Sequence, residues 1–280
     1  MRRLSVVLTA AALAASGCAQ GRTVVPVRMQ SAVFASPAAP AMLDVSSHEN
    51  TVRMVATIMV RDLGLPLPET VMVYVYSSRQ VFERGLIDDG QVSRVRAAEL
   101  SDFAVGVGKR RQLLLHHESN VGRGEWVRLV AHELSHVAQI ELAEGEGRAE
   151  QWLAEGMAEW VAFRVLEQLR LDTVGRRRVV ALETVRDHPA IVARRLDLET
   201  LGTPRGFTLR HLREGSHPTY QLAYLLTDYL IARDGFDRVV EYFQSFAKHV
   251  DRRGNFAAAF GQSLAEFEQE AIAHLTTSTH

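Results

Sequence analysis

The amino-acid sequence predicts an α+β fold, in which a small N-terminal mixed sheet precedes a second half made mostly of helices. The clearest strand is VMVYVY at 71–76, which is β-branched and aromatic and follows a turn that contains proline. Two shorter strands are expected at 103–107 and 112–116, joined by a turn at 108–110. Beyond them, apolar residues recur at helical spacing. The segments with this spacing are 127–142, 151–163, 179–201 with a break at Pro189, 220–233, 236–249 and 264–275.

The first 21 residues are typical of a targeting segment. Two arginines precede the apolar run 4–15, which is too short to remain in a bilayer as a spanning helix. The ASGC that ends at Cys18 resembles a bacterial lipobox, in which the cysteine is lipidated; an ordinary signal peptide is the alternative. Cys18 is the only cysteine in the chain, as suits an oxidising envelope. We therefore expect a lipoprotein of the cell envelope, and Ala19 favours the outer membrane, facing the periplasm.

The composition of the chain is that of a soluble globular protein. The 280 residues carry a net charge of −1, and 47% of them are hydrophobic and 23% charged. This is enough for one hydrophobic core, with at most a small second subdomain. The sequence contains no basic patch and no basic stretch interleaved with aromatic residues, which argues against nucleic acid as a partner. A monomer is the expected state.

Residues 22–46 carry Pro, Ala and Ser without clear periodicity, so we expect a tether there, with a short strand at 23–28. A serine at 46 or 47 can cap a helix that runs to Leu63, where Gly and Pro follow. A serine at 77 or 78 can likewise start a short helix. From there, a loop rich in Asp, Gly and Arg is expected up to residue 103.

The motif HELSH begins the most informative part of the chain. On a helix His132 and His136 are one turn apart and point the same way, so both imidazoles can bind one zinc ion. Glu133 lies beside the first of them, where it can take a proton from a water on the metal. The surrounding apolar residues recur at the spacing of a buried helix.

The second informative stretch is QWLAEGMAEWVAF at 151–163. A catalytic zinc site needs three protein ligands and an open position, and HELSH supplies only two. Glu155 follows His136 after enough residues for the helix to end, turn and return, so it is our third candidate ligand. Glu159 falls on the same face and can accept a hydrogen bond from a ligand imidazole. A solvated helix carboxylate is an equally open reading of Glu159.

HELSH followed by WLAEGMAEW resembles the gluzincin metallopeptidases, and within them the peptidase MA-like group of small bacterial domains. The resemblance covers about residues 120–275. It implies a zincin-like fold, one Zn²⁺ held by His132, His136 and Glu155, and Glu133 as the general base. A peptide or protein is the substrate it implies.

The resemblance also implies a substrate-binding strand that forms the edge of the cleft. In this family the strand precedes the active-site helix, and the substrate backbone adds to it. The short strand before HELSH is our candidate. Its substrate-binding residues would be Gln112, Leu113, Leu114 and Leu115.

A donor to the oxyanion is the last residue that the resemblance implies, and it is a Tyr or His in the helical part. Tyr220 is our first candidate, because it follows a turn from which a side chain can reach a cleft, and His217 is the second. A core tyrosine with a satisfied hydroxyl is an equally open reading of Tyr220.

We therefore expect a zinc metallopeptidase anchored in the envelope by lipid, and an endopeptidase because an exopeptidase motif is absent from the sequence. The alternatives are an inactive zincin-fold binding or assembly lipoprotein and a zinc amidase that acts on peptidoglycan. The expected parts are a signal peptide at 1–21, a tether at 22–46, an α/β part at 47–122 and the zinc-binding helices with the helical subdomain at 123–280.

Overall fold

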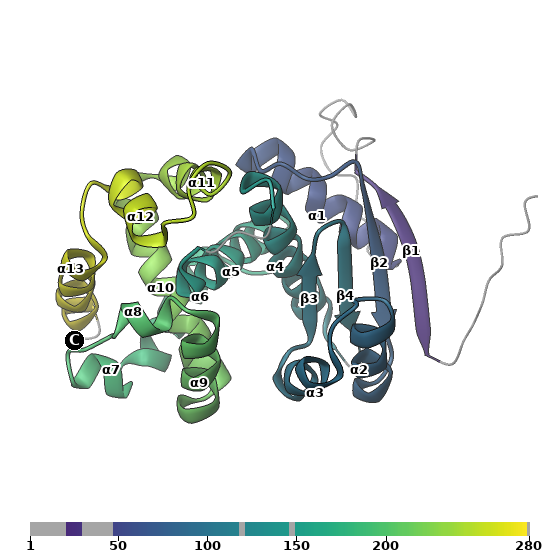
Figure 1. The fold of residues 1–280 in the computed structure, drawn as a ribbon, viewed down its shortest axis with the longest axis horizontal. Helices are drawn as coiled ribbons and strands as arrows, with labels where there is room; N and C mark the ends of the chain where they lie inside the picture. The colour runs from purple at the N-terminus through teal and green to yellow at the C-terminus, as the bar shows by residue number, and fades with distance from the viewer. Residues whose placement is uncertain (1–20, 30–46, 118–120, 146–148, 279–280) are drawn as a thin grey trace, which may run out of the picture.

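The structure, a computed structural model, describes residues 21–29, 47–117, 121–145 and 149–278. It confirms the predicted α+β class, because an N-terminal four-stranded mixed sheet is followed by a mostly helical region. In Figure 1 the sheet lies on one side of the molecule and the later helices on the other. Between them run α4 (Arg123–Leu142) and α5 (Gln151–Gln168). Cys18 and the expected lipobox lie outside the described residues.

The strands of the sheet are β1 (Arg22–Arg28), β2 (Thr70–Tyr76), β3 (Gly106–Lys109) and β4 (Gln112–His116). They lie in the order β1-β2-β4-β3, with only β2 and β4 parallel. β2 and β4 confirm two predicted strands, whereas β3 begins later than the predicted 103–107. β1 confirms the short strand expected at 23–28, so this part of the expected tether belongs to the sheet, and residues 30–46 lie outside the described residues.

The two faces of the sheet pack against different helices, because alternate side chains point to opposite faces. Val73 of β2 and Leu113 of β4 are register partners and face the main core, together with α4. Tyr76 and Leu114 belong to a second, smaller cluster on the other face. The sheet is therefore covered on both faces, and its two central strands are rigidly placed.

The first two helices begin at the predicted serines. Ser47 accepts a hydrogen bond from a backbone N–H in the first turn of α1 (His48–Leu63), which ends at Gly64 in the left-handed conformation. Ser78 caps α2 (Arg79–Asp88) in the same way. These caps satisfy backbone donors that a helix N-terminus leaves without partners.

The prediction of a loop up to residue 103 is wrong, because most of this segment is helical. α3 (Arg94–Phe103) is capped by Ser93, and only Ala97 and Ser101 on it are buried. With so few buried positions the helix has little apolar periodicity, so its sequence resembles that of a loop. α3 places Phe103 next to β3, where the predicted strand would have begun.

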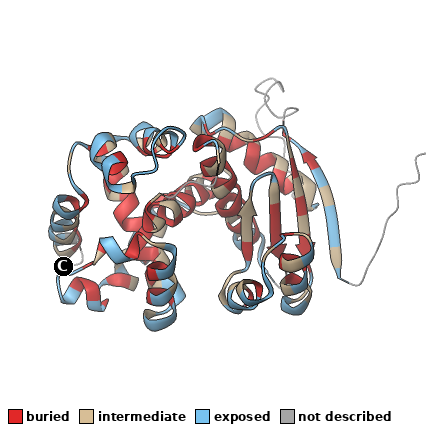
Figure 2. Cartoon of the chain, in the orientation of Figure 1, coloured by how far each residue is buried: buried red, intermediate tan, exposed pale blue. Residues whose placement is uncertain are grey.

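α4 and α5 pack against each other along their length and form the centre of the molecule (Figure 1). Both are mostly buried in Figure 2, as a helix between two layers of structure must be. The fully buried Val130, Leu134 and Leu153 contribute to the same core. Gly156 of α5 allows a later helix to approach closely, since a Cβ there would collide with the carbonyl oxygen of Ala223.

The C-terminal helices are α6 (Val174–Val185), α7 (Pro189–Val192), α8 (Leu198–Leu201), α9 (Pro204–Glu214), α10 (Ser216–Asp234), α11 (Phe236–Ser245), α12 (Arg252–Phe260) and α13 (Leu264–Ser278). The segment expected to be helical over 179–201 is interrupted before Pro189, as predicted, and a second time before Leu198, so that it is divided into α6, α7 and α8. A separate helix, α9, starts at Pro204, because proline is tolerated in a first helical turn. None of the helices in the described ranges is long and apolar enough to cross a membrane.

The start of α5 is tied to the C-terminal helices through Glu150. Its side chain is fully buried, and Oε1 lies 2.8 Å from Nε of Arg252 on α12. Its backbone N–H donates to the hydroxyl of Tyr242 on α11, also at 2.8 Å. Burial raises the pKa of Glu150 to about 7, although the Arg252 guanidinium opposes the shift.

This raised pKa predicts that stability falls as pH rises. The folded state holds the Glu150 proton more tightly than the unfolded state does, so its contribution is complete below the ordinary carboxyl pKa of 4.5 and is lost as pH rises to about 7. Glu150→Gln cannot ionise. Between pH 4.5 and 8 its free energy of unfolding should therefore gain about 1–3 kcal/mol relative to wild type.

Urea unfolding at the two pH values measures this gain. Glu241→Gln is the control, because Glu241 is an exposed carboxylate on α11. A difference between Glu150→Gln and wild type that does not change with pH would contradict the prediction.

Candidate metal centre

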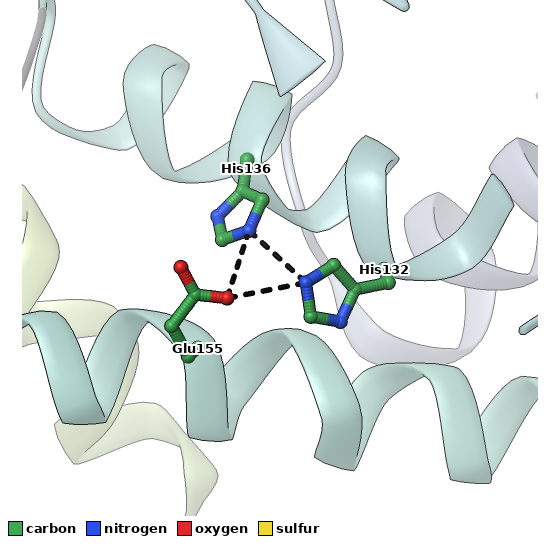
Figure 3. A group of neighbouring side chains, drawn as sticks. All are labelled: His132, His136 and Glu155. Atoms are coloured by element: carbon green, nitrogen blue, oxygen red, sulfur yellow. Dashed lines mark hydrogen bonds and ion pairs between the residues drawn. The ribbon is translucent and has the colours of Figure 1, made fainter. Parts of the chain in front are cut away.

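Two helices bring together the three side chains that the sequence predicts as metal ligands. α4 carries His132 and His136, and α5 carries Glu155 (Figure 3). The two imidazole Nε2 atoms are 3.3 Å apart. Oε2 of Glu155 lies 3.2 Å from Nε2 of His132 and 3.4 Å from Nε2 of His136. These three residues form a group that could hold one metal ion.

The shape of this group fits a small tetrahedral cation. Ligand atoms at about 2.0–2.1 Å from the centre of a tetrahedron are about 3.3 Å from one another, which matches the three observed separations. Oε2 of Glu155 is buried and accepts no hydrogen bond of good geometry from the described residues. This oxygen and the two imidazole nitrogens converge on one point, and a cation there would interact with all three.

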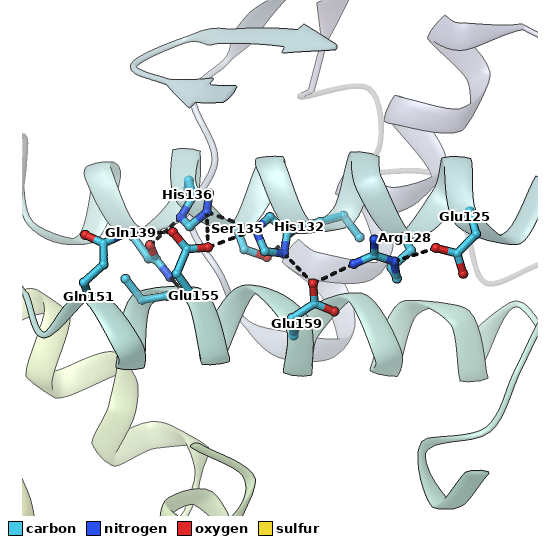
Figure 4. Close-up of polar contacts among 11 residues, drawn as sticks. Glu125, Arg128, His132, Ser135, His136, Gln139, Gln151, Glu155 and Glu159 are labelled. Atoms are coloured by element: carbon cyan, nitrogen blue, oxygen red, sulfur yellow. Dashed lines mark hydrogen bonds and ion pairs between the residues drawn. The ribbon is translucent and has the colours of Figure 1, made fainter. Parts of the chain in front are cut away.

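Each of the three side chains has a further polar partner (Figure 4). Glu159 Oε1 lies 3.1 Å from Nδ1 of His132. The side-chain oxygen of Gln139 lies 3.0 Å from Nδ1 of His136, and Gln151 donates to Oε1 of Glu155 at 2.8 Å. Glu159 therefore lies beside the imidazole of His132 and is buried, not a solvated helix carboxylate. Sequence reasoning missed the two glutamines, although both occur within one helical turn of the residue that they contact.

Arg128 is a further residue that the sequence did not single out. It lies one turn before His132 on α4, and its Nη1 donates to Glu159 Oε1 at 2.6 Å. Its Nε donates to Glu125 at 2.8 Å. The only signal in the sequence is its position four residues before His132, which alone does not distinguish it from a surface arginine.

The carboxylates make this site attractive to positive charge. Burial opposes the charge on His132, but the carboxylates of Glu155 and Glu159, close to its two ring nitrogens, outweigh burial and raise the pKa of His132 to about 10. Burial likewise opposes ionisation of Glu159, but Arg128 and His132 lower its pKa to about 2. The pKa of Glu155 is also lowered, by the two imidazoles against the effect of burial. Both carboxylates are therefore ionised at neutral pH.

Glu133 is held beside this group by β3. Its Oε2 accepts a hydrogen bond of 2.7 Å from the backbone N–H of Gly108. A Cβ on Gly106 would lie 2.6 Å from Oε1 of Glu133, and one on Gly108 would collide with the backbone oxygen of Glu133. β3 can approach α4 this closely only because both positions are glycine. Burial raises the pKa of Glu133, while the imidazoles oppose the shift.

The prediction that the strand at 112–116 forms the edge of the cleft and binds substrate is wrong. β4, which contains Gln112, lies between β2 and β3, so its backbone is paired on both sides. Its apolar side chains are also fully buried; these are Leu113, Leu114 and Leu115. β3 is the strand at this edge of the sheet and the one beside α4. A single sequence does not determine strand order, because the order depends on contacts between distant segments.

A cleft passes over the three converging side chains and consists of two adjoining hollows of about 360 and 370 Å³. One extends along α4 towards Arg128 and the other towards Gln139. Phe103 contributes to both, and its ring lies 4.6 Å from that of the buried His211 on α9. His211 is another residue that sequence reasoning missed. The residues that line both hollows are Phe103, Ala104, Gly106, His132, Glu133 and Tyr220.

The two candidate oxyanion donors lie differently in this cleft. Tyr220 lies in the second turn of α10, and its ring centroid is 6.0 Å from that of His132. Burial and then the carboxylate of Glu155 raise the pKa of Tyr220 well above 10, so its hydroxyl keeps its proton. His217 is exposed, lines only one hollow and has Nε2 3.4 Å from the hydroxyl of Thr184. Of the two, Tyr220 is the one beside the group formed by His132, His136 and Glu155.

Comparison of the chain with protein-family models, curated proteins and solved structures finds no match. The interpretation therefore depends on the geometry of the site. The buried group of His132, His136 and Glu155 is consistent with the H-E-x-x-H and distant Glu arrangement of a zincin-like site.

The close approach of β3 to Glu133 predicts a steric effect at Gly108. Gly108→Ala should lower the free energy of unfolding by about 1–3 kcal/mol, because the added methyl group has no space beside α4. Gly124→Ala is the control, because a Cβ on that glycine of α4 meets nothing within 4 Å. Urea unfolding of both variants tests this, and equal stabilities would contradict it.

Proposed function

We propose that this protein is a zinc-dependent metallopeptidase of the gluzincin type, similar to the peptidase MA-like group, and that it acts as an endopeptidase. The supporting observation is the triangle of His132, His136 and Glu155, whose edges of 3.2–3.4 Å match those of a tetrahedral zinc site. The motif HELSH with a distant Glu is the ligand set of that family. Its general base, Glu133, lies beside the triangle.

These three side chains would hold the Zn²⁺ ion, whose chemistry when bound is Lewis-acid activation of water and of the scissile carbonyl. Glu133 is placed to take the proton from the attacking water and later to deliver it to the leaving nitrogen. Its raised pKa suits the first of these steps, because it makes the carboxylate a better base. The bond from Gly108 fixes Oε2 and leaves Oε1 for proton transfer.

Tyr220 is our proposed donor to the oxyanion. This residue, whose hydroxyl keeps its proton, comes from the helical side of the cleft and lines both hollows, whereas Glu133 comes from the opposite side. A donor in that position can stabilise negative charge as it develops on the substrate oxygen. His217 is the weaker candidate, because its ring is exposed and faces Thr184.

The substrate that fits this cleft is an extended polypeptide. The edge strand β3 supports this, together with Ala104 and Gly106, which line both hollows. A peptide can add to such an edge by backbone hydrogen bonds. The hollows extend on both sides of the triangle, so a chain can continue past the scissile bond in both directions, which favours an endopeptidase over an exopeptidase.

We further propose that lipid on Cys18 anchors the enzyme in the bacterial outer membrane, facing the periplasm. The lipobox-like ASGC at 15–18 and the absence of other cysteines from the sequence support this. A peptide or protein substrate and the membrane lipid are then its partners, without nucleic acid.

Metal analysis tests the ligand set. We expect one zinc per chain in wild type and a small fraction of that in Glu155→Ala, because two imidazoles alone do not hold zinc tightly. Glu141→Ala is the control, since Glu141 lies on the same α4 but lines neither hollow of the cleft. Well-folded wild type that stays free of zinc after reconstitution would contradict the proposal and favour a binding or assembly protein.

A second prediction tests the proposed base. Glu133→Gln should retain zinc and lose casein cleavage by a factor of at least about 10³, because the amide cannot take a proton. Glu141→Gln should keep full activity. Substantial cleavage by Glu133→Gln would exclude Glu133 as the base, and a zinc-loaded wild type that cleaves purified murein but not casein would indicate the peptidoglycan amidase.

A further inference from the structure

We propose that Arg128 is a positioning residue for the metal centre, which holds the carboxylate of Glu159 against the imidazole of His132. This inference rests on the proposed function, since it concerns zinc bound by His132, His136 and Glu155. It adds to the site a residue whose guanidinium acts on His132 through the carboxylate of Glu159.

The geometry joins Arg128 and His132 through a single atom. Oε1 of Glu159 lies 2.6 Å from Nη1 of Arg128 and 3.1 Å from Nδ1 of His132 (Figure 4). A carboxylate oxygen 3.1 Å from Nδ1 favours a proton on that nitrogen, which would leave the lone pair of Nε2, 3.2 Å from Glu155 Oε2, for the metal ion. Arg128 therefore holds Oε1 of Glu159 in place, and this oxygen in turn orients the imidazole ring of His132.

Glu159 differs from the partners of the other two ligands. His136 and Glu155 are contacted by the neutral amides of Gln139 and Gln151, which need no counter-charge. Glu159 instead offers a carboxylate, whose side chain is only 4% exposed and accepts a hydrogen bond from a guanidinium. A buried charge without a partner is strongly unfavourable, so Glu159 can serve His132 in this orientation only with a cation beside it.

The guanidinium is itself held in place from its other edge. Its Nε donates to Glu125 at 2.8 Å, and Glu125 also accepts a hydrogen bond of 3.1 Å from Arg177 of α6. A planar guanidinium that is bound on two edges keeps one orientation. A lysine ammonium acts as a single point charge and would not hold the carboxylate in one orientation. Glu125 is half exposed, so it steadies Arg128 without being part of the buried site.

The competing explanation is an ordinary ion pair that joins α4 to α5. That explanation predicts an effect of Arg128 on folding stability and none on zinc affinity. Loss of the positive charge alone would tighten binding of a nearby cation. Weaker zinc binding in Arg128→Met would therefore indicate lost orientation of His132, because the change in charge acts in the opposite direction.

The test is a double-mutant cycle on the zinc Kd of the full chain, measured by competition with a chelator. Arg128→Met and Glu159→Gln should each raise the Kd by about tenfold, the usual effect of removing an outer partner of a metal ligand. In the Glu159→Gln background Arg128→Met should change the Kd by less than about twofold, because the shared carboxylate is already absent. Arg164→Met is the control, since Arg164 forms an ion pair with Glu167 on α5.

Circular dichroism of the zinc-free proteins checks that each variant is folded, and Arg128→Lys replaces Arg128→Met if the latter does not fold. A second readout is the visible spectrum of the Co²⁺-loaded protein, which should change in Arg128→Met and not in Arg164→Met. An unchanged or tighter Kd in Arg128→Met, or an equal loss in both backgrounds, would overturn the inference. Wild type that binds no zinc would instead overturn the proposed function.

Discussion

The packing of α4 against α5 is the constraint on which the rest of this molecule depends. The two helices form the centre of the core, and each carries part of the metal-ligand group. A slip of one residue would move a helix by about 1.5 Å and rotate its side chains by about 100°. Either movement would separate Glu155 from His132 and His136, which now lie 3.2–3.4 Å from it. The geometry of the site is therefore a property of the apolar interface.

A row of polar side chains lies along the same interface, as Figure 4 shows. It includes Arg128, Glu159 and His132, and the side chains of these three residues are more than half buried. Buried ion pairs contribute little net stability, because desolvation offsets their attraction, but a mismatched partner costs several kcal/mol. We infer that this row penalises alternative registers of the two helices, while the apolar contacts supply most of the stability.

The sequence predicted the parts of the fold that depend on local pattern. These include β2, β4, the serine caps of α1 and α2, and the α4–α5 pair with its His132, His136 and Glu155. It failed on strand order, which contacts between distant segments decide: β3 rather than β4 is the edge strand. It also failed on α3, which has too few buried residues to show helical periodicity. Arg128 and His211 were missed for the same reason, since only their neighbours in space distinguish them from ordinary residues.

The central position of α4 and α5 also bears on how the protein matures. Many small metal sites form only when the ion joins loops that are otherwise unfolded. Here, helices that the core already holds carry the three candidate ligands, and neutral amides contact two of them. If this group binds a metal ion, the polypeptide can therefore fold first and take up the ion last. The compartment where folding finishes, and the metal available there, would then decide which ion the chain acquires.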